Sequence, residues 1–233
     1  MKRLKYLLFL TPFLIMSSCG DFFMICSLNP FYIKKNITLA ESLNGNWTVK
    51  QVKKSLSNSD TPNYLWKIAD TTSVWNIERS KTREKNEKGY EEDFEYYYTV
   101  KLIGNFPDSA LYQFKLVVFV IDGVIYGDFT PFSNSAIESS QMAKDHYLFT
   151  HSVARIDGIG DNWSLTWLGY ETVKQMIGKR ANIKYKWISD QNRLILSGSS
   201  NELTNMIERY GTNKRYIDWE YQPCILKMNR IKK

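Results

Sequence analysis

The side chains best suited to acid–base chemistry or metal binding are the two histidines, His146 and His151. Histidine titrates near neutral pH and is a common metal ligand, so two in one segment raise the question of a shared metal. If both lie on one strand, their five-residue separation places them on opposite faces, because side chains alternate between the faces of a strand. The spacing therefore disfavours a shared metal. We expect His151 to hydrogen-bond a neighbouring loop instead, with Asp128 as a conceivable partner.

No familiar catalytic motif accompanies these histidines. The sequence lacks the Gly-x-Ser-x-Gly nucleophile elbow, the His-Glu-x-x-His helix and a glycine-rich phosphate loop. The acidic run Glu91-Glu92-Asp93 lies in a polar stretch and is expected to be solvated, whereas Ser199 and Ser200 are suited to capping a helix. We therefore expect a protein that is not an enzyme and has no catalytic, cofactor-binding or metal-binding residues.

The first residues of the chain have the order of a secretory signal peptide. Lys2, Arg3 and Lys5 give a positive start, residues 6–16 are uncharged and mostly apolar, and two small serines follow. This apolar run would form only about 16 Å of helix, roughly half of the hydrocarbon core of a bilayer. We therefore expect a cleaved export signal rather than a permanent transmembrane anchor.

The segment Met16-Ser17-Ser18-Cys19 resembles the lipobox of bacterial lipoproteins, although the family usually has Leu in place of Met16. The resemblance implies that residues 1–18 are removed and that Cys19 is acylated with palmitate-type chains. The partner of Cys19 would then be the lipid bilayer of the bacterial cell envelope, with the outer membrane as the expected location. Several acyl chains together anchor a protein stably. The alternative is an ordinary signal peptide with a coincidental cysteine.

Removal of the signal peptide also changes the charge. The whole chain has 31 Lys and Arg residues against 24 Asp and Glu, a formal net charge of +7. Residues 1–18 hold three of the positive residues and no acid, so the mature chain has 28 against 24, a net charge of +4. The remaining basic residues are scattered, and an exported protein does not meet cytosolic nucleic acid. We therefore expect no nucleic-acid partner.

Two further cysteines, Cys26 and Cys224, remain in the mature chain if Cys19 is acylated. An exported protein reaches a compartment that permits disulfides, so the two can form a bridge. Two unpaired thiols are the alternative, because the sequence does not show whether the pair has the required geometry. Neither cysteine has the Cys-x-x-Cys or Cys/His spacing of a zinc site.

The elements that would position these residues are mostly strands. Alternating, β-branched or aromatic stretches predict strands near residues 47–52, 73–79, 93–103, 111–121, 124–129, 146–156, 163–168, 181–188, 194–196 and 224–231. Asp122-Gly123 predicts a tight hairpin turn. Apolar residues at helical spacing predict two short helices over residues 171–179 and 200–210. This pattern predicts a mainly β domain, an antiparallel barrel or sandwich, over residues 41–233.

Residues 19–40 precede the first predicted strand and are expected to be the lipidated N-terminus and a short tether. The tether contains the apolar run Phe22-Phe23-Met24-Ile25. These side chains are expected either to lie in the bilayer interface beside the lipid or to pack back on the domain.

The start of the first predicted strand, Gly45-Asn46-Trp47, looks like the Gly-x-Trp opening of the lipocalin and calycin families. The resemblance implies an up-and-down antiparallel barrel whose base is closed by Trp47, with a basic residue of a late strand, Arg230, stacked over the ring. Residues 127–131, 147–153 and 200–203 are also similar to an uncharacterised group of bacterial lipocalin-like lipoproteins. That likeness implies a fold and an envelope location but no activity.

Aromatic residues at alternating spacing are the remaining functional clue. Tyr96 and Tyr98 share one face of a predicted strand, and Trp163 and Trp167 share one face of another. Inside a barrel they would line a pocket for an apolar or planar ligand, or they would simply fill the core. We expect an envelope lipoprotein that binds a small hydrophobic or amphipathic ligand. The alternative is an accessory subunit that interacts with another envelope component, whose identity the sequence does not show.

Overall fold

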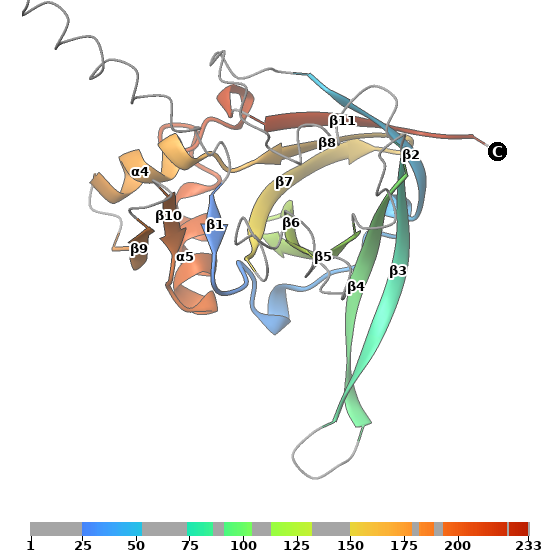
Figure 1. Ribbon diagram of the computed structural model, residues 1–233, viewed down its shortest axis with the longest axis horizontal. Helices are drawn as coiled ribbons and strands as arrows, with labels where there is room; N and C mark the ends of the chain where they lie inside the picture. Colours follow the sequence, from blue (N-terminus) through green and yellow to red (C-terminus); the bar gives the residue numbers. More distant parts are fainter. Residues whose placement is uncertain are drawn as a thin grey trace, which may run out of the picture.

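The computed structural model describes residues 25–52, 74–85, 91–103, 113–131, 150–178, 182–188, 193–222 and 224–232. Their main feature is a closed barrel of eight antiparallel strands (Figure 1). In barrel order these are β11 (Cys224–Arg230), β2 (Gly45–Gln51), β3 (Val74–Lys85), β4 (Glu91–Ile103), β5 (Gln113–Ile121), β6 (Val124–Pro131), β7 (Ser152–Ile159) and β8 (Asn162–Trp167). The predicted mainly β, antiparallel barrel is confirmed.

The strands follow one another around the barrel in an up-and-down order. Each strand from β2 to β8 pairs with the next along the chain, and β11 closes the ring between β8 and β2. Closure leaves no open sheet edge within the ring. The predicted Asp-Gly turn joins β5 to β6, with positive φ at both Asp122 (50°) and Gly123 (75°), the backbone conformation that a two-residue hairpin turn of this hand requires.

The antiparallel pairing defines two ends of the barrel. Strands β2, β6 and β8 begin at one end, where β11 finishes, and we call it the Arg230 end. At the opposite end β8 finishes and β3, β5, β7 and β11 begin, and we call it the Trp167 end.

The paired strands β3 and β4 continue past the Arg230 end as a two-stranded arm, visible as the long ribbon in Figure 1. The two strands pair with each other from Val74 to Lys85. By contrast, the described pairing of β3 with β2 stops at Ile77, and that of β4 with β5 begins at Tyr98. The described arm beyond these residues therefore has two strands and two open edges.

Large apolar side chains line the interior of the barrel, and we call this set the barrel core. Four of them are tryptophans, two from β8 and one each from β2 and β3. The buried members of the set are Leu43, Trp47, Val49, Trp75, Ile77, Tyr98, Val100, Leu102, Phe114, Leu116, Val118, Phe129, Ala154, Ile156, Trp163, Leu165, Trp167, Cys224, Leu226 and Met228. Period-two alternation along each strand directs these residues inward. The barrel interior is therefore apolar and rich in aromatic rings.

A second layer covers one side of the barrel (Figure 1). It contains helices α4 (Tyr170–Gly178) and α5 (Ser200–Tyr210) and a small sheet of β1 (Cys26–Ser27), β10 (Arg193–Leu196) and β9 (Tyr185–Ile188). Short 3-10 turns lie at Lys34–Asn36, Glu41–Leu43 and Trp219–Tyr221. Both helices fall where the spacing predicted them, whereas the strands predicted over 181–188 and 194–196 belong to this small sheet and not to the barrel.

Apolar side chains of the second layer pack on the outer face of β5, β6 and β7, and we call this set the outer cluster. Its buried members include Phe119 and Tyr126 from the barrel wall and Leu203 and Ile207 from α5. Helix α5 begins with a reciprocal capping box, in which Ser199 and Glu202 each accept from the other's backbone N–H. The cap and the apolar face together explain why a short helix is stable here.

The chain before the barrel belongs to the fold from Ile25 onward. Ile25 and Phe31 are fully buried in the outer cluster, and Cys26 and Ser27 pair with Ile195 and Leu196 of β10. Of the two alternatives for the apolar run, Ile25 packs back on the domain, so the part of the predicted tether from residue 25 is not a loose linker. Cys19 and residues 1–18 lie outside the described residues. No helix in the described ranges has the length and hydropathy needed to cross a bilayer.

Candidate functional site

A plug of backbone and aromatic groups fills the Arg230 end of the barrel. The guanidinium carbon of Arg230 lies 4.4 Å from the centroid of the Trp47 ring, and Trp47 Nε1 donates to the carbonyl of Leu43 at 2.8 Å. Arg230 also donates to the carbonyl oxygens of Ser42 and Asn44. The structure therefore brings the residues of the Gly-x-Trp resemblance together, with a cation over the indole face.

Gly45 is the third residue of this plug, and its backbone explains why glycine stands there. Its φ is +134°, a conformation that side-chain-bearing residues rarely adopt. A Cβ at this position would lie 2.5 Å from a terminal nitrogen of Arg230. Glycine thus lets the arginine approach the backbone closely enough to seal this end.

Two further aromatic polar groups of the barrel core, those of Trp163 and Tyr98, also have partners. Trp163 Nε1 donates to the carbonyl of Gly160 at 2.9 Å, and Tyr98 Oη accepts from the backbone N–H of Ala40 at 2.9 Å. With Trp47 included, these three aromatic polar groups are all hydrogen-bonded. The plug at the Arg230 end is therefore a satisfied structural seal.

Two other tryptophans of the barrel core differ in this respect. Trp75 of β3 pairs across the sheet with Trp47, and Trp167 is the last residue of β8. Each is only 1 % exposed and belongs to the barrel core. Neither Nε1 atom has a hydrogen-bond acceptor in the structure as described. The described barrel core thus holds two buried indole donors without a partner.

The energetic cost of these unpaired donors is appreciable. A buried donor that loses water and gains no acceptor costs about 1–3 kcal/mol, and such groups are uncommon in folded proteins. Their surroundings are apolar, and the Phe129 ring lies 5.0 Å from that of Trp167. The cross-strand neighbours are Trp47 and Leu102 for Trp75, and Cys224 and Ala154 for Trp167. No Lys or Arg side chain whose burial the structure describes is buried. The site is an uncharged, aromatic environment with two spare donors.

The residues predicted as pocket lining divide between the barrel core and the arm. Tyr98 and Trp163 are buried in the barrel core but their polar atoms are partnered, and Trp167 is buried with its donor unpaired. Tyr96 is not in the barrel core: it lies on the arm, half-buried, with the Arg79 guanidinium 5.9 Å from its ring centroid. Strand alternation shows that Tyr96 and Tyr98 share a face, but not that the barrel stops between them.

Trp75 is the residue that sequence reasoning missed. It lies in the strand predicted over residues 73–79, and its signal is the alternation of Trp75 and Ile77 with the polar Asn76 and Glu78. The alternation identifies a common face but not which face is inward. Pairing of Trp75 with Trp47 across β2 and β3 supplies that information, and it is known only from the structure.

The two remaining cysteines do not form a bridge. Cys224 is a buried thiol of the barrel core, and burial raises its pKa well above the ordinary value. Cys26 is a thiol on β1, which pairs with β10 outside the barrel. The disulfide alternative is therefore wrong in this structure, because the two thiols belong to elements that face different sides of the barrel wall.

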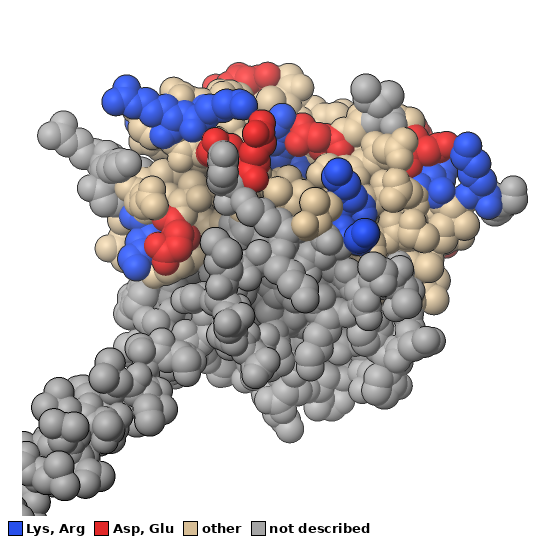
Figure 2. Space-filling view, turned by 90° about the horizontal axis from the view of Figure 1, so that it is seen from above, with Lys and Arg blue, Asp and Glu red and all other residues tan. Residues whose placement is uncertain are grey.

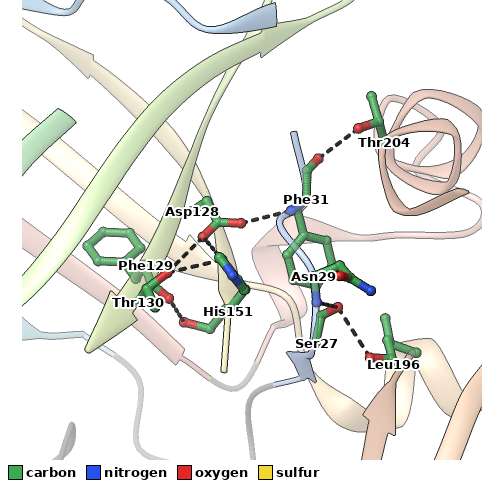
Figure 3. A network of polar contacts seen from close by, with 10 residues as sticks. Ser27, Asn29, Phe31, Asp128, Phe129, Thr130, His151, Leu196 and Thr204 are labelled. Carbon is green, nitrogen blue, oxygen red and sulfur yellow. Dashed lines mark hydrogen bonds and ion pairs between the residues drawn. The ribbon is translucent and has the colours of Figure 1, made fainter. Parts of the chain in front are cut away.

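The histidine that sequence analysis singled out lies in a buried polar cluster between the barrel and the second layer (Figure 3). His151 Nδ1 lies 2.7 Å from Oδ1 of Asp128, the predicted partner, and 3.0 Å from Oγ1 of Thr130. The other carboxylate oxygen of Asp128 accepts from the backbone N–H of Phe31 at 2.8 Å. His146 lies outside the described residues.

This cluster fastens the N-terminal segment to both layers. Ser27 exchanges two backbone hydrogen bonds with His151, at 2.8 and 2.9 Å, and its hydroxyl donates to the carbonyl of Leu196. Thr204 of α5 donates to the carbonyl of Phe31 at 3.1 Å. In a catalytic triad the acid and the nucleophile use different ring nitrogens of the histidine, whereas here both oxygens face Nδ1. We interpret the cluster as a structural clamp.

Charged groups at the surface are mostly paired. A groove of about 900 Å³ outside the Arg230 end is lined by residues of both signs, among them Glu78, Arg79 and Asp161. Ion pairs join Arg79 to Glu41 and Arg230 to Asp161 there. Figure 2 shows the same mixture of signs on the face that it presents. Among the residues that the structure describes, no group of three or more His, Cys, Asp and Glu side chains is arranged to hold a metal.

Comparisons with other proteins do not assign the chain to a family. No protein-family model, curated protein or solved structure matches it. The functional conclusion therefore depends on the geometry of the barrel and on the sequence.

Proposed function

We propose that the mature protein is a lipid-anchored bacterial envelope lipoprotein with a lipocalin-like barrel that binds a small hydrophobic or amphipathic molecule. The observation that carries the binding proposal is a contrast among the tryptophans of the barrel core. The indole N–H groups of Trp47 and Trp163 are hydrogen-bonded, whereas those of Trp75 and Trp167 are buried in apolar surroundings without acceptors. Largely apolar sites with a few placed polar groups are typical of small-molecule binding.

Native mass spectrometry tests the binding proposal. We would purify the mature chain carrying Cys19→Ala, so that no acyl chain confuses the spectrum, and expose it to an extract of envelope lipids. We expect a bound species of defined mass that is released on activation in the gas phase. Unliganded spectra after purification, after exposure to the extract and after addition of small aromatic probes would contradict the proposal.

The anchor proposal rests on the lipobox-like segment together with the packing of Ile25. Only five residues lie between Cys19 and fully buried Ile25, and the six steps from one to the other span at most about 22 Å when fully extended. An acylated Cys19 would therefore hold the barrel close to the bilayer surface. The short distance from Cys19 to Ile25 suits a domain that works at the membrane surface.

Fractionation of cells tests the anchor. We expect Cys19→Ala to remove acylation and to move the protein from the membrane fraction to the soluble fraction. Cys26→Ala is the matched control, because Cys26 lies in β1 within the fold and its loss leaves the lipobox-like segment intact. Retention of the Cys19→Ala protein in the membrane fraction would show that another segment holds it there.

The arm favours a second candidate function, docking to another protein of the envelope. Two-stranded ribbons are marginally stable alone, and an open strand edge can pair with a partner chain. A photo-crosslinking residue at Lys81 on the arm tests this in cells, with the same residue at exposed Lys227 on β11 as the control. A discrete adduct from position 81 only would support docking, and identical patterns from both positions would contradict it.

A further inference from the structure

We propose that the ligand of the barrel is an uncharged molecule with a flat apolar body and carbonyl-type oxygen, and that oxygen of this kind accepts the hydrogen bonds that the buried indole N–H groups of Trp75 and Trp167 otherwise lack. The proposal rests on the proposed binding function and specifies its ligand chemistry.

The two spare groups determine which half of the hydrogen bond the ligand supplies. An indole Nε1–H is a donor only, so its partner must be an acceptor. Both Nε1 atoms are buried and without acceptors in the described structure. A hydrocarbon would leave both donors unpaired, and an ammonium ligand would present only further donors to them. An oxygen with available lone pairs satisfies them.

The charge of the barrel interior selects a neutral acceptor over a carboxylate. Burying an ionised carboxylate is costly unless a cation accompanies it. None of the Lys and Arg side chains whose burial the structure describes is buried, and Arg230 is engaged with Asp161 and backbone carbonyls. The oxygen of a ketone, ester or amide accepts hydrogen bonds without that cost. The geometry thus points to a neutral carbonyl compound.

Aromatic walls near the donors favour a flat ligand body. Phe129 packs against Trp167 with ring centroids 5.0 Å apart and an interplanar angle of 42°. Phe114 of β5 and Trp75 of β3 also belong to the barrel core. Rings of this kind offer broad apolar faces against which a planar group packs well.

A buried unpaired hydroxyl elsewhere in the fold provides an internal control. Tyr126 Oη also lacks a hydrogen-bond partner among the described residues, but its ring packs in the outer cluster, 5.9 Å from Trp219. Tyr126 is therefore outside the barrel interior and should not affect the ligand. Trp163 is the second control, because its indole N–H is already bonded to Gly160.

Three naphthalene probes of similar shape test the proposal by isothermal titration. 2-Acetylnaphthalene carries the carbonyl, 2-ethylnaphthalene replaces it with a methylene group, and 2-naphthoate replaces it with a carboxylate. We expect the wild-type protein to bind the acetyl compound about tenfold more tightly than the ethyl compound, the gain of roughly one recovered hydrogen bond. We expect 2-naphthoate to bind more weakly than the acetyl compound.

The variants then assign the preference to the two indoles. Trp75→Phe and Trp167→Phe should each reduce the acetyl-to-ethyl affinity ratio, and the double variant should bring it to about one. Trp163→Phe and Tyr126→Phe should leave the ratio unchanged. If a Trp75 or Trp167 variant fails to fold, ¹⁵N-labelled tryptophan in the wild type replaces it: the two indole N–H resonances should shift with the acetyl compound and not with the ethyl compound.

The outcomes separate this proposal from the binding function beneath it. Equal affinity for the acetyl and ethyl compounds, or a preference that survives in the double variant, would overturn the carbonyl assignment while leaving ligand binding in place. Tighter binding of 2-naphthoate would overturn the neutral-ligand assignment. Binding of none of the probes, together with unliganded native spectra, would overturn the proposed function itself.

Discussion

The guanidinium carbon of Arg230 lies 4.4 Å from the centroid of the Trp47 ring, and the same side chain is 3.0 Å from a carboxylate oxygen of Asp161. The arginine thereby joins the start of β2, the end of β11 and the β7–β8 turn at one end of the barrel. It stacks on an indole and donates to two backbone carbonyls at once, a combination that a planar guanidinium can make and an ammonium cannot.

Arg230→Lys should therefore destabilise the barrel although it preserves the charge. We expect a loss of about 1–2 kcal/mol in the free energy of unfolding, measured by urea denaturation, from the lost stacking and the lost bidentate donation. Lys232→Met is the control. The Lys232 side chain is 84 % exposed, and the substitution removes only its ion pair with Asp161, in which the nitrogen and oxygen lie 3.9 Å apart. It should change stability by no more than about 0.5 kcal/mol. Wild-type stability in Arg230→Lys would show that charge alone suffices.

Asp128→Asn should loosen the clamp on the N-terminal segment. The carboxylate is 1 % exposed and its two oxygens face the Phe31 N–H, His151 and the Thr130 hydroxyl. An amide nitrogen would place donors against donors on one side, at a cost of roughly 2–4 kcal/mol in unfolding free energy. Hydrogen exchange at the Phe31 amide should accelerate in parallel.

The matched control for the clamp is Asp157→Asn. Asp157 is 47 % exposed and pairs with Arg155 at 2.8 Å on the surface. Such exposed pairs contribute little, so the expected change is within about 0.5 kcal/mol. If both variants lost the same stability, the buried cluster would contribute nothing beyond a surface ion pair.

The reactivity and oxidation state of the Cys224 and Cys26 thiols can be tested chemically. Burial raises the pKa of Cys224, so it should remain protonated and react slowly with a thiol reagent such as DTNB at pH 8. In the Cys19→Ala protein, denaturation without reductant should expose two titratable thiols per chain. None under those conditions would show that an oxidised bridge forms in the exported protein.

The predictable part of this fold is local. Helix α5 matches its predicted bounds because the signals that define it are local. The capping Ser199 precedes the helix, its apolar face lies within it, and Gly211 follows it. The β5–β6 hairpin was likewise predictable from Asp122-Gly123 between two apolar runs. Features that depend on residues within one segment can be read from the sequence.

The parts that could not be predicted depend on distant segments. β1 has two residues and exists only because it pairs with β10, more than 160 residues later. Trp75 could not be assigned to the interior, nor Tyr96 to the arm, before the register of β3 with its neighbours was known. Only one of the two unpaired tryptophans of the candidate site was therefore predicted from the sequence. Trp167 was selected by its spacing, and Trp75 was missed.

Tyrosine-to-phenylalanine changes at two buried positions should have opposite effects at neutral pH. Tyr98→Phe leaves the Ala40 N–H without its acceptor, and we expect a loss of about 1 kcal/mol. Tyr126→Phe removes a buried hydroxyl with no partner among the described residues, so stability should stay the same or rise by up to about 1 kcal/mol. Urea denaturation at pH 7 measures both. Equal losses would mean that the Tyr126 hydroxyl has a partner.

Tyr126 also predicts a specific loss of stability in alkali. Burial raises the pKa of this phenol to about 12, against 10.0 for an ordinary tyrosine. Between these values the unfolded chain releases the proton while the folded chain keeps it, so the contribution is fully present below pH 10 and declines as pH rises toward 12. A shift of this size corresponds to roughly 3 kcal/mol at most.

The alkaline loss is measured as the difference between wild type and Tyr126→Phe. Urea denaturation from pH 9 to pH 12 should give a shallower decline for the variant, because phenylalanine has no proton to release. Titrations of other groups, including Tyr98, whose pKa burial also raises, are common to both proteins and cancel in the difference. Parallel declines would show that the folded and unfolded chains ionise Tyr126 alike, and that its hydroxyl reaches solvent.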